Sequence, residues 1–183
     1  PGRAVKSYDE RRTSTATGTE ETKVSWTAEE LDIHGRATHS RETQTTGAHG
    51  TTAERKNIAY DPFGRLNAYD ELATDTARPD VSVATHWTGG YDQQSRLVSF
   101  DENRKETALG FNLTTTRQRT KSETFYDGEG RLTKYQDTST DGLGSTFVTN
   151  WTGTFNTLSQ LTGFTDESTQ TADGLNLIRK TAR

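Results

Sequence analysis

Apolar and polar residues alternate along several stretches of the chain, which is the pattern of half-buried β-strands. From Val81 to Tyr91, every second residue is valine, threonine, tryptophan, glycine or tyrosine, and the stretch from Phe147 to Phe155 has a similar order. We therefore predict a strand over each range. No helix is expected, and only the string TAEELD, residues 27–32, favours one.

Each alternating stretch is followed by a short recurring string of residues. Its clearest copy is YDPFGRL, from Tyr60 to Leu66. Pro62 presets φ for a turn, Asp61 can accept hydrogen bonds from nearby backbone N–H groups, and Gly64 stands at the fourth position of a type I turn. We predict a β-hairpin turn here and at YDGEGRL, residues 126–132. The string YDQQSRL, residues 91–97, lacks glycine, so its turn is expected to be less sharply specified.

The same frame recurs along the chain. Its arginine position is occupied by Arg3, Arg36, Arg65, Arg96, Arg131 and Gln160, which are separated by 33, 29, 31, 35 and 29 residues. Six copies with a period of roughly 31 residues are therefore predicted. The motif residues are Tyr60, Asp61, Gly64, Arg65, Leu66, Tyr91, Asp92, Arg96, Leu97, Tyr126, Asp127, Gly130, Arg131 and Leu132.

Tryptophan occurs only in alternate copies, at Trp26, Trp87 and Trp151, with spacings of 61 and 64 residues. This spacing favours a complete unit of two copies. Glycine follows two residues after Trp87 and after Trp151, so we expect the indole ring to lie across a glycine gap beside an aromatic side chain. The three tryptophans are interpreted as core packing, because buried tryptophan is usually structural.

The repeat period of roughly 31 residues leaves room for two strands of ten to twelve residues and two turns. We predict an all-β fold, a tandem array of β-hairpins forming a meander or a spiralling, solenoid-like sheet. Residues 1–183 form a single array, which we interpret as an internal piece of a longer chain because it lacks methionine. Leu66 and Tyr69 are three residues apart, so either a β-bulge intervenes or both sheet faces are partly covered; the second is favoured.

Composition supports an ordered but thin-cored β protein. Only 28% of the residues are hydrophobic, whereas 35 are threonine, a β-branched residue that favours extended backbone. The net charge of −4 and the lack of a basic block give no electrostatic footprint for nucleic-acid binding. The chain has no cysteine, and no apolar run approaches the length of a membrane span.

The frame YDxxGRLxxYxD resembles the YD repeat of the Rhs family, which also occurs in insecticidal toxin-complex shells, teneurins and bacterial wall-associated proteins. The copies that start at Tyr60 and at Tyr126 match it best. The resemblance implies tandem hairpins in one long spiralling sheet on a large secreted or cell-surface protein, here of bacterial type. The period is longer than is usual in that family, and Leu31 and Gln160 replace the tyrosine and arginine of the frame.

No catalytic, metal or cofactor site is predicted. His34 and His39 are five residues apart, and Asp32 can share a strand face only with His34; two ligands do not make a metal site. Asp127, Glu129 and Asp137 lack the oxygen spacing of a calcium loop. Carboxylate pairs such as Asp70–Glu71 and Asp101–Glu102 recur at strand ends. Repeated pairs of this kind are typical of a repeat, whereas catalytic pairs are normally unique, so an enzyme is not expected.

Asn112 and Asn150 each begin an N-x-T tripeptide, which makes them candidate glycosylation sites if the protein is extracellular. Threonine-rich stretches at residues 14–19 and 114–116 are candidates for O-linked sugars. A sugar coat would also protect the edges of a long β-array.

Three functions remain in competition, and the first is favoured. It is a structural repeat protein, located outside the cell or on its surface, that forms a fibril or scaffold with neighbouring repeats or copies of itself. The second is an Rhs-type shell segment that encloses a toxin. The third is a carbohydrate-binding adhesin, which would require Trp87 and Trp151 to face solvent.

Overall fold

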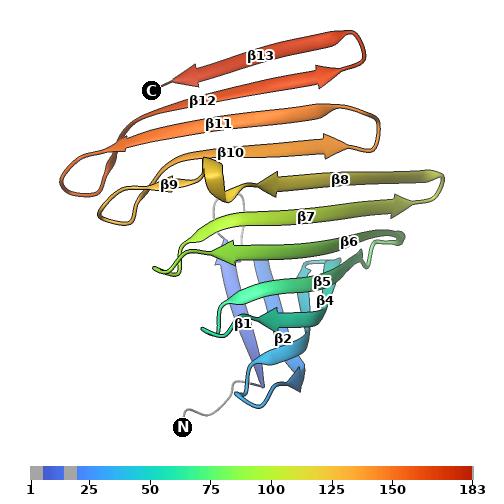
Figure 1. Cartoon of the computed structure of the whole chain (residues 1–183). Helices are drawn as coiled ribbons and strands as arrows, with labels where there is room; N and C mark the ends of the chain where they lie inside the picture. The colour runs from blue at the N-terminus through green and yellow to red at the C-terminus, as the bar shows by residue number, and fades with distance from the viewer. Residues whose placement is uncertain (1–5, 15–19, 183) are drawn as a thin grey trace. The chain divides into compact units, whose positions relative to one another are not determined.

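The computed structural model describes residues 6–14 and 20–182 (Figure 1). The first arginine position of the repeat, Arg3, and most of the threonine-rich stretch at 14–19 lie outside the described residues. Within them the chain is all-β, as the alternating pattern predicts. Its strands form an antiparallel meander that does not close on itself.

Each strand of this meander pairs with the next one along the chain, except that β8 is followed in the sheet by β10, and β9 pairs only with β10. The strands are β1 (Ser7–Ser14), β2 (Glu20–Leu31), β3 (Ala37–Thr46), β4 (His49–Tyr60), β5 (Leu66–Asp75), β6 (Arg78–Tyr91), β7 (Leu97–Ala108), β8 (Phe111–Arg119), β9 (Phe125–Tyr126), β10 (Leu132–Asp141), β11 (Thr146–Phe155), β12 (Leu161–Ala172) and β13 (Leu175–Ala182). A single 3-10 turn, Lys121–Glu123, precedes β9 in the described part. The helix that residues 27–32 favour is absent, because TAEEL forms the end of β2.

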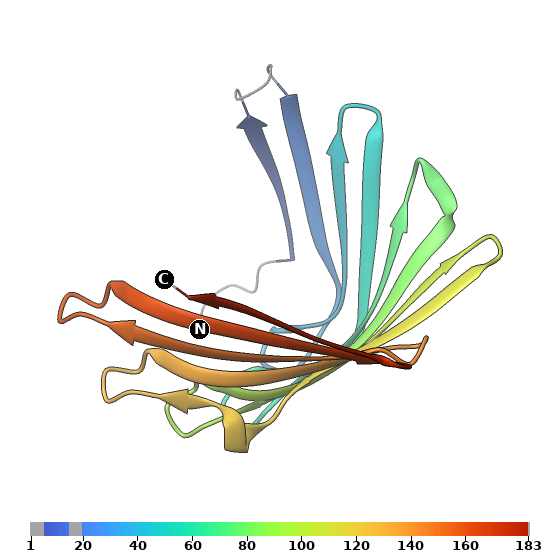
Figure 2. The same ribbon diagram turned by 90° about the horizontal axis from the view of Figure 1, so that it is seen from above.

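The contacts between residues define two compact units. The first contains the described residues up to His86 together with Arg104–Asn112, and the second contains Trp87–Asn103 and the residues from Leu113 onward. In the first unit β1 to β5 pair in sequence. In the second unit β10, β11, β12 and β13 do the same, and they lie side by side in both ribbon views (Figures 1 and 2).

A β-bulge follows the turn at residues 61–65, and it allows Leu66 and Tyr69, three residues apart, to lie on the same face of the sheet. Tyr60 pairs with Leu66 and Ala59 pairs with Ala68, so Asn67 has no partner of its own in the register. An extra residue reverses the alternation of faces, which brings positions three apart to one side. The β-bulge, which is the alternative that the sequence favours less, is therefore correct. Bulges of the same kind occur at the starts of β3, β10 and β12.

The core is thin, in keeping with the composition. The buried hydrophobic side chains of the described residues are Val24, Ile58, Val98 and Phe100. Trp26 stacks on Tyr8 with ring centres 5.6 Å apart, and Trp151 stacks on Tyr135 at 5.5 Å. Aromatic pairs between neighbouring strands thus replace part of the deep core of a globular domain.

The predicted glycine gap is present beside two of the tryptophans. A Cβ atom on Gly153 would lie 2.3 Å from the Trp151 ring, and a Cβ atom on Gly89 would lie 2.2 Å from the Trp87 ring. The indoles therefore lie flat along their own strands over residues that have no side chain. All three tryptophans are half-buried.

Candidate functional site: a repeated aspartate–arginine turn

The most strongly built feature of the chain is the turn that recurs between the strands. In the copy at residues 61–65, the Gly64 N–H donates to the Asp61 carbonyl at 2.9 Å, and the Asp61 N–H donates to the Arg65 carbonyl at 2.9 Å. Gly64 has φ of +83°. These bonds close a hairpin turn over Asp61–Gly64, as the sequence predicts, and Gly64 lies in the left-handed region.

The Asp61 carboxylate organises this turn with both of its oxygens. Oδ1 accepts from the N–H groups of Phe63 at 2.9 Å and Arg65 at 3.0 Å, and Oδ2 accepts from Arg65 Nε at 2.6 Å. The side chain therefore satisfies two backbone donors that the loop leaves unpaired, and it fixes the arginine that follows. The reach of the aspartate side chain explains why arginine stands four residues after aspartate in the motif.

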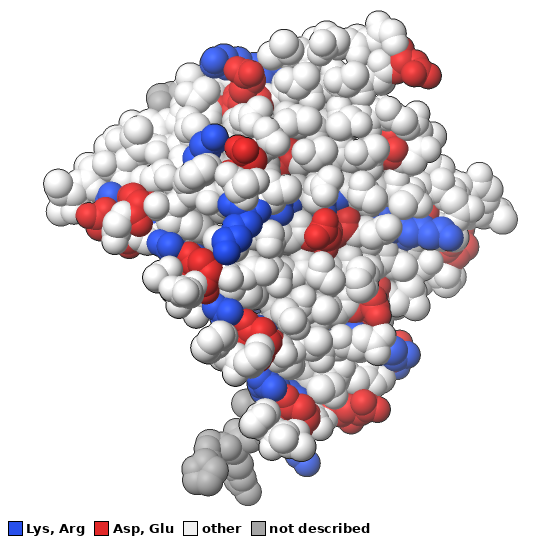
Figure 3. Space-filling model, in the orientation of Figure 1, with Lys and Arg blue, Asp and Glu red and all other residues white. Residues whose placement is uncertain are grey.

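The same set of bonds recurs in three further turns. The aspartate accepts from arginine Nε at 2.7 Å in the pair Asp32–Arg36, and at 2.6 Å in the pairs Asp92–Arg96 and Asp127–Arg131. In each copy Oδ1 also accepts two backbone N–H groups. Figure 3 shows basic and acidic atoms side by side at several places on the face in view.

Two copies hold the turn without glycine. Ser95 and Ser159 have φ of +64° and +60°, in the left-handed region that favours glycine. The backbone bonds of the turn are nevertheless kept, with Ser95 N–H donating to the Asp92 carbonyl at 3.1 Å. In the second of these copies Asn156 Nδ2 donates to Gln160 Oε1 at 2.9 Å, so an amide pair replaces the ion pair.

The arginine of one turn covers the aromatic ring of the next turn. Its guanidinium carbon lies 4.4 Å from the Tyr60 ring centre for Arg36, 4.5 Å from that of Tyr126 for Arg96, and 5.1 Å from that of Phe155 for Arg131. These are cation–π distances. The motif tyrosine and arginine therefore link successive copies rather than residues of one copy.

A hydroxyl hydrogen bond strengthens two of these links. The Tyr60 hydroxyl donates to the Ala37 carbonyl at 3.0 Å, and the Tyr126 hydroxyl donates to the Leu97 carbonyl at 2.7 Å. Each acceptor is the residue directly after the arginine that covers the ring. Burial raises the pKa of both tyrosine hydroxyls, so they remain protonated donors.

The turn carboxylates are ionised at neutral pH. Desolvation raises the pKa of Asp61, but hydrogen bonds from the backbone and side chain of Arg65 and from Phe63 outweigh it and hold this pKa below its ordinary value. The same causes lower the pKa of Asp32, Asp92 and Asp127. A carboxylate held in this way is a fixed turn anchor and a poor proton donor.

Two polar arrangements were not anticipated from the sequence. Asp137 is buried and accepts from Arg119 Nε at 2.6 Å and from Arg117 at 2.7 Å. Asp141 organises a turn of the same geometry, with bonds to the N–H groups of Leu143 and Ser145. The D-x-x-G spacing of Asp141 and Gly144 could have revealed the second, whereas no local spacing signals the first.

The predicted modification sites occupy different settings. Asn112 is exposed on β8, whereas Asn150 lies half-buried on β11 and its Oδ1 accepts from Gln136 Nε2 at 2.8 Å.

Of the histidines, His39 Nε2 lies 2.9 Å from Glu54 and His86 Nδ1 lies 2.6 Å from Asp70. Among the described residues no three histidine, aspartate or glutamate side chains form a group that could hold a metal ion.

Within the described residues there is no helix with the length and apolar character that crossing a membrane requires. Comparison of the chain with models of protein families, with curated proteins and with solved structures gives no match in any of the three. The function must therefore be inferred from the geometry of the chain itself.

Proposed function

We propose that the chain is a structural, extracellular or cell-surface repeat protein whose hairpins form part of a fibril or scaffold, and that it resembles the YD repeats of the Rhs family in its turn chemistry. The observation that carries this proposal is the recurrence of one turn with the same bonded atoms. A repeated bond network is suited to building an elongated array, because each copy contacts its neighbours and adds length in one dimension. A catalytic site would need a single, distinctive environment.

The two outer strands favour self-assembly. β1 and β13 are the ends of the strand order, so in the described part each has a paired neighbour on one side only. On β13, Leu177 is 54% exposed and Ile178 is 62% exposed. A strand edge with apolar side chains is a template for pairing with a further strand. The proposed partner is therefore a neighbouring repeat or another copy of the array.

Candidate glycans fit this proposal at Asn112, whose side chain faces solvent on β8. Attachment at Asn150 would displace its bond to Gln136, so Asn112 is the stronger candidate of the two. A carbohydrate-binding adhesin is less well supported, because Trp151 is stacked on Tyr135 and covers Gly153 instead of standing free.

The test is electron microscopy of the purified chain over a range of concentrations, with two variants. Ile178→Lys adds a charge on the β13 edge, whereas the control Leu109→Lys adds the same charge in a turn where the side chain is 92% exposed. We expect fibres from the unmodified chain and the control, and few or none from Ile178→Lys. Monomers at all concentrations would refute self-assembly, and closed hollow particles would favour the shell.

A further inference from the structure

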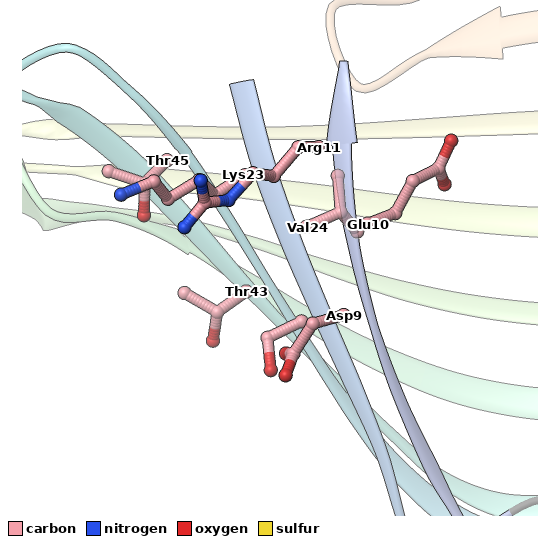
Figure 4. Close-up of a pocket in the computed structure, with 8 residues that line it drawn as sticks. Asp9, Glu10, Arg11, Lys23, Val24, Thr43 and Thr45 are labelled. Atoms are coloured by element: carbon pink, nitrogen blue, oxygen red, sulfur yellow. The ribbon is translucent and has the colours of Figure 1, made fainter. Parts of the chain in front are cut away.

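A pocket lies on one face of β1, β2 and β3, away from the turns, and several of its lining side chains are charged or carry a hydroxyl group. It has a volume of about 270 Å³, and its lining residues come from all three strands (Figure 4). The strand register arranges most of them in two rows. Asp9 pairs with Ser25 and Ser25 pairs with Thr43 in the first row, and Arg11 pairs with Lys23 and Lys23 pairs with Thr45 in the second.

The second row places two cations directly opposite each other. Like charges at directly opposed positions destabilise a β-ladder, so Arg11 and Lys23 are an unfavourable pair unless an anion lies between them. Figure 4 shows their nitrogen atoms on the same side of the strands, near Thr45. Among the side chains that the structure describes, no carboxylate lies within ion-pair distance of Lys23. The pocket therefore contains a positive end that is not neutralised within it.

Arg11 does have one partner, but it is weakly held. Its Nε lies 3.3 Å from Glu21, and both side chains are largely exposed. Exposed ion pairs contribute little and exchange readily, so a ligand anion can replace Glu21 at the guanidinium. The fork of arginine suits a carboxylate, which accepts two parallel hydrogen bonds from it.

The first row has the opposite character. It offers the Asp9 carboxylate as an acceptor and the hydroxyls of Ser25 and Thr43 as both donors and acceptors. The two rows are two residues apart along each strand, which is about 6.7 Å. A ligand that fits both rows must carry an anionic group at one end and hydroxyl groups at the other. The distance between these two ends must be about the width of one sugar ring.

We propose that this pocket binds a hexuronate unit of an acidic polysaccharide. The uronate carboxylate lies between Arg11 and Lys23, and the ring hydroxyls bond to Asp9, Ser25 and Thr43. A free phosphate would satisfy only the cationic row and would meet the negative charge of Asp9. The site lies on a strand face and not on a strand edge, so it is independent of the proposed self-assembly and would let an assembled array hold an acidic matrix.

The experiment is titration calorimetry of the full chain with tetragalacturonate at low salt, with the methyl-esterified oligomer and inorganic phosphate as comparisons. We expect saturable binding of tetragalacturonate alone. Lys23→Gln should weaken it by about fivefold or more, as expected for loss of one charge-assisted contact. The control Lys105→Gln removes the same charge from β7, outside the pocket, and should leave the affinity unchanged. Equal effects of the two variants, or equal binding of phosphate, would overturn the proposal.

A third variant separates recognition from general attraction. Asp9→Asn removes a negative charge, so simple attraction between the protein and a polyanion predicts tighter binding. Recognition of ring hydroxyls predicts weaker binding, because the carboxylate is the stronger acceptor. Tighter binding by Asp9→Asn would contradict the proposed orientation of the sugar. All three substituted residues are exposed, so these variants should fold as the parent chain does.

Discussion

The guanidinium carbon of Arg96 lies 4.5 Å from the centre of the Tyr126 ring, in the next copy of the turn. Arg96 is held by Asp92 in its own turn, and Tyr126 also donates its hydroxyl hydrogen bond to Leu97. Two interactions thus connect two turns that the chain separates by a whole hairpin, and the bond from Asp92 holds Arg96 in place for one of them. The consequences of this linkage can be measured by removing one interaction at a time.

Tyr126→Phe removes the hydroxyl and keeps the ring under Arg96. Because the Leu97 carbonyl then loses its side-chain donor, we expect the free energy of unfolding to fall by about 1 kcal/mol. Urea denaturation followed by circular dichroism measures this change. Tyr8→Phe is the control, since the ring of Tyr8 stacks on Trp26 and its side chain is partly exposed. An equal loss in both variants would show that the hydroxyl bond has no specific role.

Gly153→Ala should disturb the indole that covers it. The added Cβ atom would lie 2.3 Å from one Trp151 ring carbon and 2.7 Å from another, so the ring must move. Overpacking of this kind costs about 1–3 kcal/mol, and tryptophan fluorescence should shift as Trp151 leaves its stack on Tyr135. At Gly128 a Cβ atom meets nothing within 4 Å, and Gly128→Ala should therefore leave both the spectrum and the stability near those of the parent.

Ser159→Gly should stabilise the protein. Ser159 has φ of +60°, a conformation that costs a side-chain-bearing residue about 1 kcal/mol and that glycine adopts freely. The reverse change, Gly130→Ser, should lower stability by a similar amount because Gly130 has φ of +83°. Thermal unfolding of the two variants checks the pair of opposite signs, and a change of the same sign in both would disprove the strain argument.

Asp137→Asn should be among the most damaging single changes. Asp137 is only 6% exposed and balances Arg117 and Arg119. Removal of one partner from a buried ion pair typically costs about 3–5 kcal/mol. Glu167→Gln breaks the exposed pair with Lys180, for which about 0–1 kcal/mol is expected. Chemical denaturation distinguishes the two, and equal losses would mean that Asp137 is not effectively buried.

Acidification should destabilise the array through its turns. The folded-state pKa of Asp32, Asp61, Asp92 and Asp127 lies below the ordinary value, so the unfolded chain binds protons first as the pH falls. The stabilisation is present above about pH 4, the unfolded-state pKa, and is lost as the pH falls through the folded-state values.

Thermal unfolding from about pH 7 to about pH 2 follows this loss. Asp61→Asn should lower the melting temperature at neutral pH and should also reduce its fall on acidification, because one of the responsible carboxylates is gone. A variant with the full acid dependence of the parent would place the titrating groups elsewhere.

The hairpins and the turns could be predicted from the sequence because their causes are local. Strand alternation, Asp61 as acceptor and Gly64 at the fourth turn position all act within a few residues. The links between copies could not be predicted, since the pairing of Arg36 with Tyr60 depends on how neighbouring hairpins are placed. The buried Asp137 was missed for the same reason, because its two arginines lie on another strand.

The bulge was predicted only as the weaker alternative. Its signal, an apolar residue and an aromatic three positions apart, is equally consistent with a sheet covered on both faces. The strand register decides between them, and a register is a property of two segments. The pocket on β1, β2 and β3 has no signal in the sequence either, because its residues form a row only after three strands have paired.

The turn at Asn156 and Gln160 is, in effect, a natural double replacement of the charged pair by neutral amides. It keeps the backbone bonds of its relatives, yet its side chains have no carboxylate to protonate. The chain therefore contains two kinds of turn. Turns with an aspartate weaken when the carboxylate is protonated in acid, whereas the amide turn is not affected by acid. Acid should therefore weaken the chain at its carboxylate turns and leave the turn at Asn156 and Gln160 unchanged.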